Sequence, residues 1–180
     1  MVTANKALLA THGPELFSTA DAAQRDLIFE ASVGGGIPII RMLREGLASD
    51  RLQSIYGIIN GTSNFILSAM AKEGRAYDEV LQEAQREGFA EADPTMDVGG
   101  ADAAQKLSIL LALGFGAQIP YAEILTEGID TVDAKDIAYA SHFGYRIKSL
   151  AIGREHDGEI EARVHPTLIR DGALMAAVDG

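Results

Sequence analysis

The chain has 180 residues, with 26 acidic side chains against 15 basic ones, and its formal net charge is −11. This composition is typical of a globular domain and excludes fibrous and disordered chains. Because the negative charge repels phosphate backbones and anionic lipid, we expect no nucleic acid and no membrane among its partners. The absence of cysteine excludes disulfides, thiolate nucleophiles and thiolate-bound metals. The N-terminus carries no signal pattern, so the sequence predicts a cytoplasmic protein.

The first elements in chain order are short. Residues 2–5 are typical of the end of a strand that leads into a helix over residues 6–11. A short buried strand is expected over residues 27–31, and Pro38 then opens an amphipathic helix. Residues 52–59 are rich in isoleucine and stop at an Asn-Gly turn, which predicts the next strand.

Helices dominate the middle of the chain. After the turn, residues 62–64 can cap a helix over residues 65–72. A second helix over residues 77–88 carries its apolar residues on one face and ends at a glycine. Residues 89–100 then form a predicted acidic loop. Its carboxylates are Glu91, Asp93 and Asp97.

The remaining elements indicate the fold class. A helix is predicted over residues 101–113 and another over residues 134–145. The predicted strands are residues 124–128, 149–154 and 159–164. We therefore expect an α+β fold in which helices pack on one face of a mixed or antiparallel sheet.

Asp102 and Lys106 are the first candidate functional pair. They lie four residues apart on one helix face, where the helix changes from polar to wholly apolar. An exposed ion pair and the lining of a cleft both fit this pattern. In a cleft, the lysine could transfer a proton, and Glu91 and Asp97 would suit a cationic ligand such as an amino-acid ammonium group. The loop carboxylates could equally be solvated charges that stabilise a helix N-terminus.

The three glycines at positions 34–36 do not form a nucleotide-binding GxGxxG motif, because Ile39 occupies the position of the last glycine. Their small size could let the carbonyl oxygens of residues 30–37 surround a hard cation, although a plain tight turn explains the spacing as well. The histidines show no metal-ligand spacing. They are His12, His142, His156 and His165.

Four blocks of sequence, in this order, resemble homoserine dehydrogenase and cover essentially the whole chain. They are Thr3-Ala4-Asn5-Lys6, the run from Glu30 to Ile39, Asn60-Gly61-Thr62-Ser63-Asn64, and the run from Glu91 to Lys106. The resemblance implies an NAD(P)-dependent homodimeric enzyme that interconverts L-homoserine and L-aspartate 4-semialdehyde on the way to threonine and methionine.

The resemblance also implies residue roles. Lys106 would donate a proton to the aldehyde oxygen, and Asp102 would bind the reacting end of the substrate and orient Lys106. Further substrate-binding residues would be Glu91, Asp97, Gly61 and Thr62. NADP or NAD would contact Asn5 and Lys6, and a sodium ion would be held by backbone oxygens of Glu30, Val33, Gly35 and Ile37. Phe89 departs from the family, which often has tyrosine there.

The resemblance further divides the chain. Residues 1–31 would be the remnant of a Rossmann-type nucleotide-binding domain, and residues 32–180 a substrate-binding, catalytic and dimerisation domain that is incomplete at its C-terminus. We therefore expect the isolated chain to be inactive and to bind NAD(P) weakly. Two alternatives stay open: a non-catalytic dimerisation or ligand-binding module on this scaffold, and a different oxidoreductase with a similar lysine–aspartate pair.

Overall fold

The computed structural model describes residues 1–179 and divides the chain into two compact units. The first unit consists of residues 1–55, 104–124 and 152–162, and the second of residues 56–103, 125–151 and those from 163 onward. The predicted domain boundary after residue 31 stays a prediction. None of the helices in the described residues combines the length and the apolar character needed to cross a membrane.

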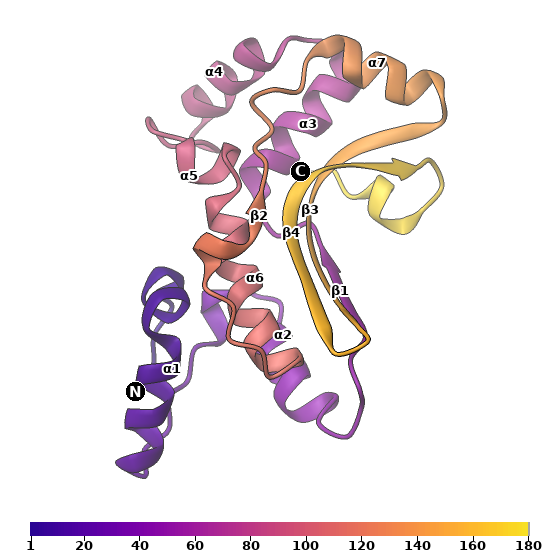
Figure 1. Cartoon of the computed structure of the whole chain (residues 1–180). Helices are drawn as coiled ribbons and strands as arrows, with labels where there is room; N and C mark the ends of the chain where they lie inside the picture. Colours follow the sequence, from indigo (N-terminus) through magenta and orange to yellow (C-terminus); the bar gives the residue numbers. More distant parts are fainter. Residues whose placement is uncertain (180) are drawn as a thin grey trace. The chain divides into compact units, whose positions relative to one another are not determined.

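Helices and a four-stranded sheet form the fold (Figure 1). The helices are α1 (Lys6–Ala22), α2 (Ile39–Arg41), α3 (Gly61–Glu73), α4 (Tyr77–Glu87), α5 (Thr95–Val98), α6 (Ala101–Gly114) and α7 (Ala134–His142). The strands are β1 (Ser54–Gly57), β2 (Leu125–Thr126), β3 (Tyr145–His156) and β4 (Glu159–Arg170), in the sheet order β1-β3-β4-β2. The predicted α+β class is confirmed.

The sheet is mixed. Strands β3 and β4 form a long curved hairpin (Figure 1). The hairpin turns at Asp157 and Gly158, which both have positive φ, as a type I′ turn requires. Strand β2 pairs in parallel with β4, so that Leu125 lies opposite Arg163.

Helix α3 is the centre of the second unit. It packs against α4, α5 and α7. The helix begins where Asn60 caps it and ends at Gly74 in the left-handed conformation. Helix α4 follows the predicted amphipathic pattern, with Val80 and Ala84 buried one turn apart. The core of this unit contains Ile66, Leu67, Met70, Val80, Ala84, Ala90, Val98, Ile129, Val132 and Ile137.

The first unit has a separate core, to which α1, α2 and α6 contribute. Its buried members are Leu9, Phe29, Val33, Ile40, Ile109 and Leu110. The ring centroids of Phe17 and Phe29 lie 5.4 Å apart in this core. Such a tilted aromatic pair adds to the stabilisation from buried apolar area.

The N-terminal region differs most from the sequence prediction. The helix predicted over residues 6–11 continues to Ala22, with Pro14 inside it. The strand predicted over residues 27–31 is wrong, because only Ile28 pairs, in an isolated parallel bridge to Val2. Ile28 is 50% exposed. Residues Glu30–Ser32 form a 3₁₀ turn, in which the Ser32 hydroxyl donates to the Phe29 carbonyl and so competes with strand pairing.

Other elements also differ from their predicted form or bounds. The segment after Pro38 is helical, but it changes from α2 to a π-helical turn over Met42–Gly46, and Met42 is 51% exposed rather than inward. The predicted loop over residues 89–100 contains α5. Helix α7 ends at His142, and the hairpin strands are longer than expected.

Candidate active site

The turn before α3 is organised by the side chain of Asn60. Its backbone is extended, and its Oδ1 accepts a hydrogen bond from the Ser63 amide at 2.8 Å. This arrangement makes Asn60 the N-cap of α3, so the expected cap over residues 62–64 is displaced towards the N-terminus. Asn60 is only 7% exposed, and its remaining amide hydrogens therefore need protein partners.

Two carboxylates provide those partners. Asn60 Nδ2 donates to Asp97 Oδ1 at 2.6 Å and to Asp102 Oδ2 at 2.9 Å. The opposite orientation of the amide would place its oxygen against both carboxylates, so the hydrogen-bond network fixes which atom is nitrogen. The side chain thus joins three segments: the turn before α3, helix α5 and the start of α6.

Further contacts hold the acidic loop against this turn. The Thr62 hydroxyl donates to the Phe89 carbonyl at 3.0 Å, and the Ser63 hydroxyl donates to the Asp97 carbonyl at 2.9 Å. The Phe65 and Phe89 rings stack with their centroids 4.8 Å apart. Both ends of the loop are therefore fixed to the first turn of α3.

Asp102 and Lys106 both lie on α6, one helical turn apart, as the sequence predicts. Asp102 is 5% exposed, and Lys106 is partly buried. Asp102 is therefore not a solvated surface carboxylate, and a cleft beside the pair stays a prediction.

The other predicted substrate residues differ in their surroundings. Gly61 is exposed as the first residue of α3. The structure does not bring the exposed Glu91 side chain into the cluster, and its main-chain carbonyl accepts a hydrogen bond from Gln85 Nε2. Asp93 accepts hydrogen bonds from the hydroxyl and amide of Thr95, and chiefly the hydroxyl bond lowers the pKa of Asp93. Asp93 therefore shapes the loop.

The residues predicted to contact the nucleotide lie at the start of α1. Asn5 caps this helix, since its Oδ1 accepts from the Leu8 amide at 3.0 Å. Lys6 is the first residue of the helix and is partly buried. The Asn5 side-chain oxygen thus has a structural partner of its own.

The predicted cation loop has a conformation that requires glycine. Gly34 and Gly35 have φ values of +76° and +59°. The carboxylate of Glu30 accepts hydrogen bonds from the amides of Ile40 and Arg41, each at 2.9 Å. The Glu30 carboxylate thus connects this loop to α2.

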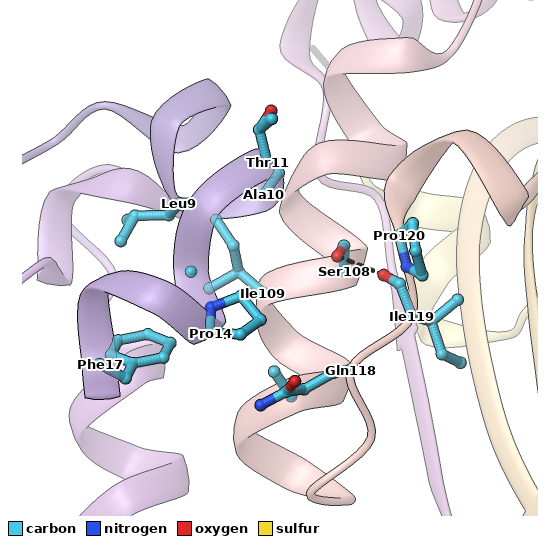
Figure 2. Close-up of a pocket in the computed structure, with 12 residues that line it drawn as sticks. Leu9, Ala10, Thr11, Pro14, Phe17, Ser108, Ile109, Gln118, Ile119 and Pro120 are labelled. Atoms are coloured by element: carbon cyan, nitrogen blue, oxygen red, sulfur yellow. Dashed lines mark hydrogen bonds between the residues drawn. The ribbon is translucent and has the colours of Figure 1, made fainter. Parts of the chain in front are cut away.

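A separate cavity of about 250 Å³ lies in the first unit, beside α1 and α6 (Figure 2). The Ser108 hydroxyl donates to the Ile119 carbonyl at its edge, at 2.6 Å. The described lining contains no ionisable side chain and none of the predicted site residues. It consists of Leu9, Ala10, Thr11, Gly13, Pro14, Phe17, Ser108, Ile109, Ala112, Gln118, Ile119 and Pro120. Such a surface does not suit a small zwitterion.

The sequence alone did not single out two buried polar residues with several hydrogen bonds, Asn60 and Lys148. Asn60 was assigned only to a turn, because an Asn-Gly pair has that common meaning. Lys148 lies one residue before the strand predicted over residues 149–154 and was given no role, yet it is 2% exposed and its Nζ makes three hydrogen bonds. A lysine inside an apolar strand was the available signal for it.

Comparison with known proteins identifies the family. The family model described as homoserine dehydrogenase matches residues 38–180. The homoserine dehydrogenase of Neisseria gonorrhoeae is 54% identical over the whole chain, which covers 41% of that protein. The enzyme of Pseudomonas aeruginosa is 51% identical over the whole chain, covering 42% of its length. The chain thus spans about two fifths of the length of these curated relatives.

Solved structures of homoserine dehydrogenases share the fold of this chain. The crystal structure of a homoserine dehydrogenase from Thiobacillus denitrificans superimposes with a TM-score of 0.97 at 55% identity, over 99% of this chain and 42% of that one. A hyperthermophilic archaeal homoserine dehydrogenase in complex with NADPH gives a TM-score of 0.83 at 29% identity, over 99% of this chain and 51% of that one. The sequence match and the shared fold together show that this chain belongs to the homoserine dehydrogenase family.

Proposed function

We propose that this chain carries the substrate-binding and proton-transferring residues of an NAD(P)-dependent homoserine dehydrogenase. The observation that carries the proposal is the pair of carboxylates, Asp97 and Asp102, held by one amide next to the helical turn that presents Lys106. The reaction would interconvert L-homoserine and L-aspartate 4-semialdehyde, a step towards threonine and methionine. Membership of the family supports this assignment.

The carboxylate pair has the chemistry to recognise an amino acid. Two negative groups close together repel each other, so a positively charged ligand beside them is favoured. A substrate ammonium group placed beside Asp97 would donate charge-assisted hydrogen bonds. Thr62 and Gly61, on the turn that Asn60 caps, would border the same substrate, and Glu91 would supply further negative charge from the loop.

Proton transfer is assigned to Lys106. The chemistry that NADPH or NADH would supply when bound is a hydride for the aldehyde carbon. Negative charge then develops on the aldehyde oxygen, and the Lys106 ammonium would neutralise it by donating a proton. In the reverse direction the Lys106 amine would accept the proton from the homoserine hydroxyl. Asp102, one turn earlier on α6, would orient the reacting end of the substrate and Lys106 itself.

The remaining assignments rest on the family resemblance and on local geometry. Asn5 and Lys6 would lie beside NADP or NAD, and the NADPH complex of the archaeal relative supports a nucleotide cofactor. A sodium ion would be bound by the carbonyl oxygens of Glu30, Val33, Gly35 and Ile37. The turn at Gly34 and Gly35 supports such a ring of oxygens. A homodimer in the cytoplasm completes the proposal.

The central test replaces Lys106 with methionine in the complete gene product that contains this chain. We expect kcat for homoserine oxidation to fall by about 10²- to 10⁴-fold, the usual contribution of a general acid or base, with a smaller change in KM. Circular dichroism and thermal melting would verify that the variant folds.

Lys72→Met is the matched control, because Lys72 is an exposed lysine near the end of α3. It removes the same charge and should leave kcat unchanged. An unaltered kcat in Lys106→Met would remove Lys106 from the proposed role. Homoserine binding by the unsubstituted protein, without turnover with NAD or NADP, would favour a ligand-binding module instead.

A further inference from the structure

The side-chain amide of Asn60 donates its two hydrogens to two different acidic residues. The two amide hydrogens go to Asp97 and Asp102, and the amide oxygen accepts from Ser63. The side chain therefore makes two kinds of contact that are chemically separable. Its oxygen begins a helix, and its nitrogen holds two carboxylates.

The nitrogen contacts determine where the two carboxylates stand. Asp97 comes from α5 and Asp102 from α6, and one oxygen of each lies within hydrogen-bond distance of the same nitrogen. Like charges at this separation move apart, or one takes up a proton, unless donors or a cation hold them. The side-chain amide of Asn60 is such a donor, and its hydrogen bonds fix the position of one oxygen of each carboxylate.

We propose that Asn60 is a positioning residue that sets the spacing of Asp97, which would bind the substrate ammonium group, and Asp102, which would orient the reacting end of the substrate. The inference rests on the proposed function and adds a residue to it. Asn60 itself transfers no proton and acts on the reaction through the two carboxylates. Its cap on α3 is a separate, structural contribution.

Asn60→Ser tests the donor role without adding charge. Serine is also a favourable N-cap, so the start of α3 is retained, but its hydroxyl is too short to bridge both carboxylates. Removal of hydrogen bonds to charged groups should raise the KM for homoserine by about 10- to 100-fold. The KM for NADPH and the melting temperature should change little.

Asn60→Asp adds a readout that a merely structural role would not affect. Aspartate has the same shape and caps a helix as well as asparagine, but at neutral pH it places a third carboxylate against Asp97 and Asp102. Three carboxylates close together favour the protonated form, so the pKa of the aspartate introduced at position 60 is expected to be raised. Once protonated, this side chain again has one hydrogen to donate to its neighbours. We therefore expect kcat/KM of the variant, relative to the unsubstituted enzyme, to recover as the pH is lowered from about 8 to 6. Lys106 lies one helical turn after Asp102 on α6 and is present both in the Asn60→Asp variant and in the unsubstituted enzyme, so it does not cause a difference between them.

Asp133→Ser provides the matched control. It exchanges the N-cap of α7, whose side chain accepts from the amides of Lys135 and Asp136, and touches neither carboxylate of the cluster. We expect it to affect stability only and to leave the KM for homoserine and the pH profile unchanged.

The measurements are steady-state kinetics and calorimetric binding of homoserine, made on the complete gene product. An active parent whose Asn60 variants keep a normal homoserine KM and pH profile would overturn the inference alone. A parent that binds homoserine without turnover, together with weaker binding by Asn60→Ser, would overturn the proposed function and uphold the positioning role. A parent that neither binds nor turns over homoserine would overturn both.

Discussion

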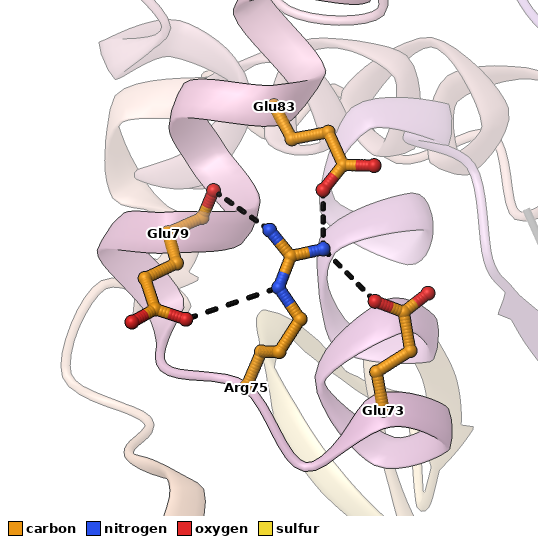
Figure 3. Close-up of polar contacts among 4 residues, drawn as sticks. All are labelled: Glu73, Arg75, Glu79 and Glu83. Carbon is orange, nitrogen blue, oxygen red and sulfur yellow. Dashed lines mark hydrogen bonds and ion pairs between the residues drawn. The ribbon is translucent and has the colours of Figure 1, made fainter.

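At the scale of single residues, Arg75 shows how one side chain fixes a connection. It lies between α3 and α4 and faces three glutamates (Figure 3). One terminal nitrogen donates to Glu73 at 2.9 Å and also to Glu83, and the other donates to the Glu79 carbonyl at 3.3 Å. These partners, first of all Glu73, raise the pKa of Arg75 above its usual value.

Arg75→Met should lower the melting temperature, because it leaves Glu73, Glu79 and Glu83 close together without a cation. The loss should be larger at low ionic strength than in about 1 M salt, which screens the repulsion. Arg75→Lys should recover only part of it, since an ammonium cannot reproduce the planar fork of a guanidinium. Thermal melting at two salt concentrations measures these differences.

Arg41 supplies the control for this prediction. It makes one ion pair, with Glu45 at 2.8 Å, and both side chains are well exposed. Arg41→Met should therefore change the melting temperature little at either salt concentration. Equal losses for the Arg75 and Arg41 variants would contradict a specific role for the three-glutamate cluster.

The sequence predicted the site residues unevenly at this scale. The placement of Asp102 and Lys106 on one helix face follows from their spacing of four residues, and both lie on α6 in the structure. The bridge from Asn60 depends on contacts 37 and 42 residues away, which no local pattern contains. Glu91 was expected to share the role of Asp97 in binding the amino-acid portion of the substrate; its carboxylate is exposed, and the shared role stays a prediction.

At the scale of elements, predictability depended on local capping and amphipathic signals. Helices α4 and α6 lie within one residue of their predicted bounds, and α4 ends at a glycine. Helix α1 was predicted too short, because only Leu9 and Gly13 are buried along it and Pro14 resembles a helix break. The strand at residues 27–31 was wrong because its pairing is restricted to a single bridge.

Gly100 separates α5 from α6 and so sets the distance between Asp97 and Asp102. Its φ is +86°, and an added Cβ would lie 2.8 Å from Thr126 Cγ2. Gly100→Ala should lower the free energy of unfolding by about 2–4 kcal/mol, through backbone strain and overpacking. It should also raise the KM for homoserine, because the start of α6 must shift.

Gly88→Ala is the comparison for that variant. Gly88 also has a positive φ, of +81°, but an added Cβ would meet nothing within 4 Å. It should cost only about 1 kcal/mol and leave the KM for homoserine unchanged. Urea unfolding and steady-state kinetics of both variants, made in the complete gene product, distinguish backbone strain alone from displacement of α6. Identical results for Gly100→Ala and Gly88→Ala would contradict a steric effect of the added Cβ at position 100.

At the scale of the whole molecule, Lys148 joins segments that are far apart in the sequence. From β3, its Nζ donates to Asn64 Oδ1 at 3.1 Å, to Ser68 Oγ at 2.9 Å and to the Val178 carbonyl at 2.5 Å. Asp179 lies 3.5 Å away as an ion-pair partner. The ammonium group thus connects α3, β3 and the end of the described chain within the second unit.

The same burial gives Lys148 a pH-dependent effect on stability. Burial lowers the pKa of Lys148 most strongly, Arg146 lowers it further, and Asp179 opposes the shift. Since the folded-state pKa is below the unfolded value of 10.5, the unfolded chain binds more protons between the two values. The contribution of this lysine to stability therefore increases as the pH rises through that interval.

Lys148→Met removes both the hydrogen bonds and this titration. At neutral pH it should lower the free energy of unfolding by about 2–4 kcal/mol, because Asn64, Ser68 and the Val178 carbonyl lose a buried donor. The difference from the unsubstituted protein should widen as the pH is raised towards 10.5, since only the parent retains the stabilising proton release. Urea unfolding at several pH values measures it, with Lys72→Met as the exposed control. A difference that stays constant with pH would show that the burial of Lys148 leaves its protonation unchanged on folding.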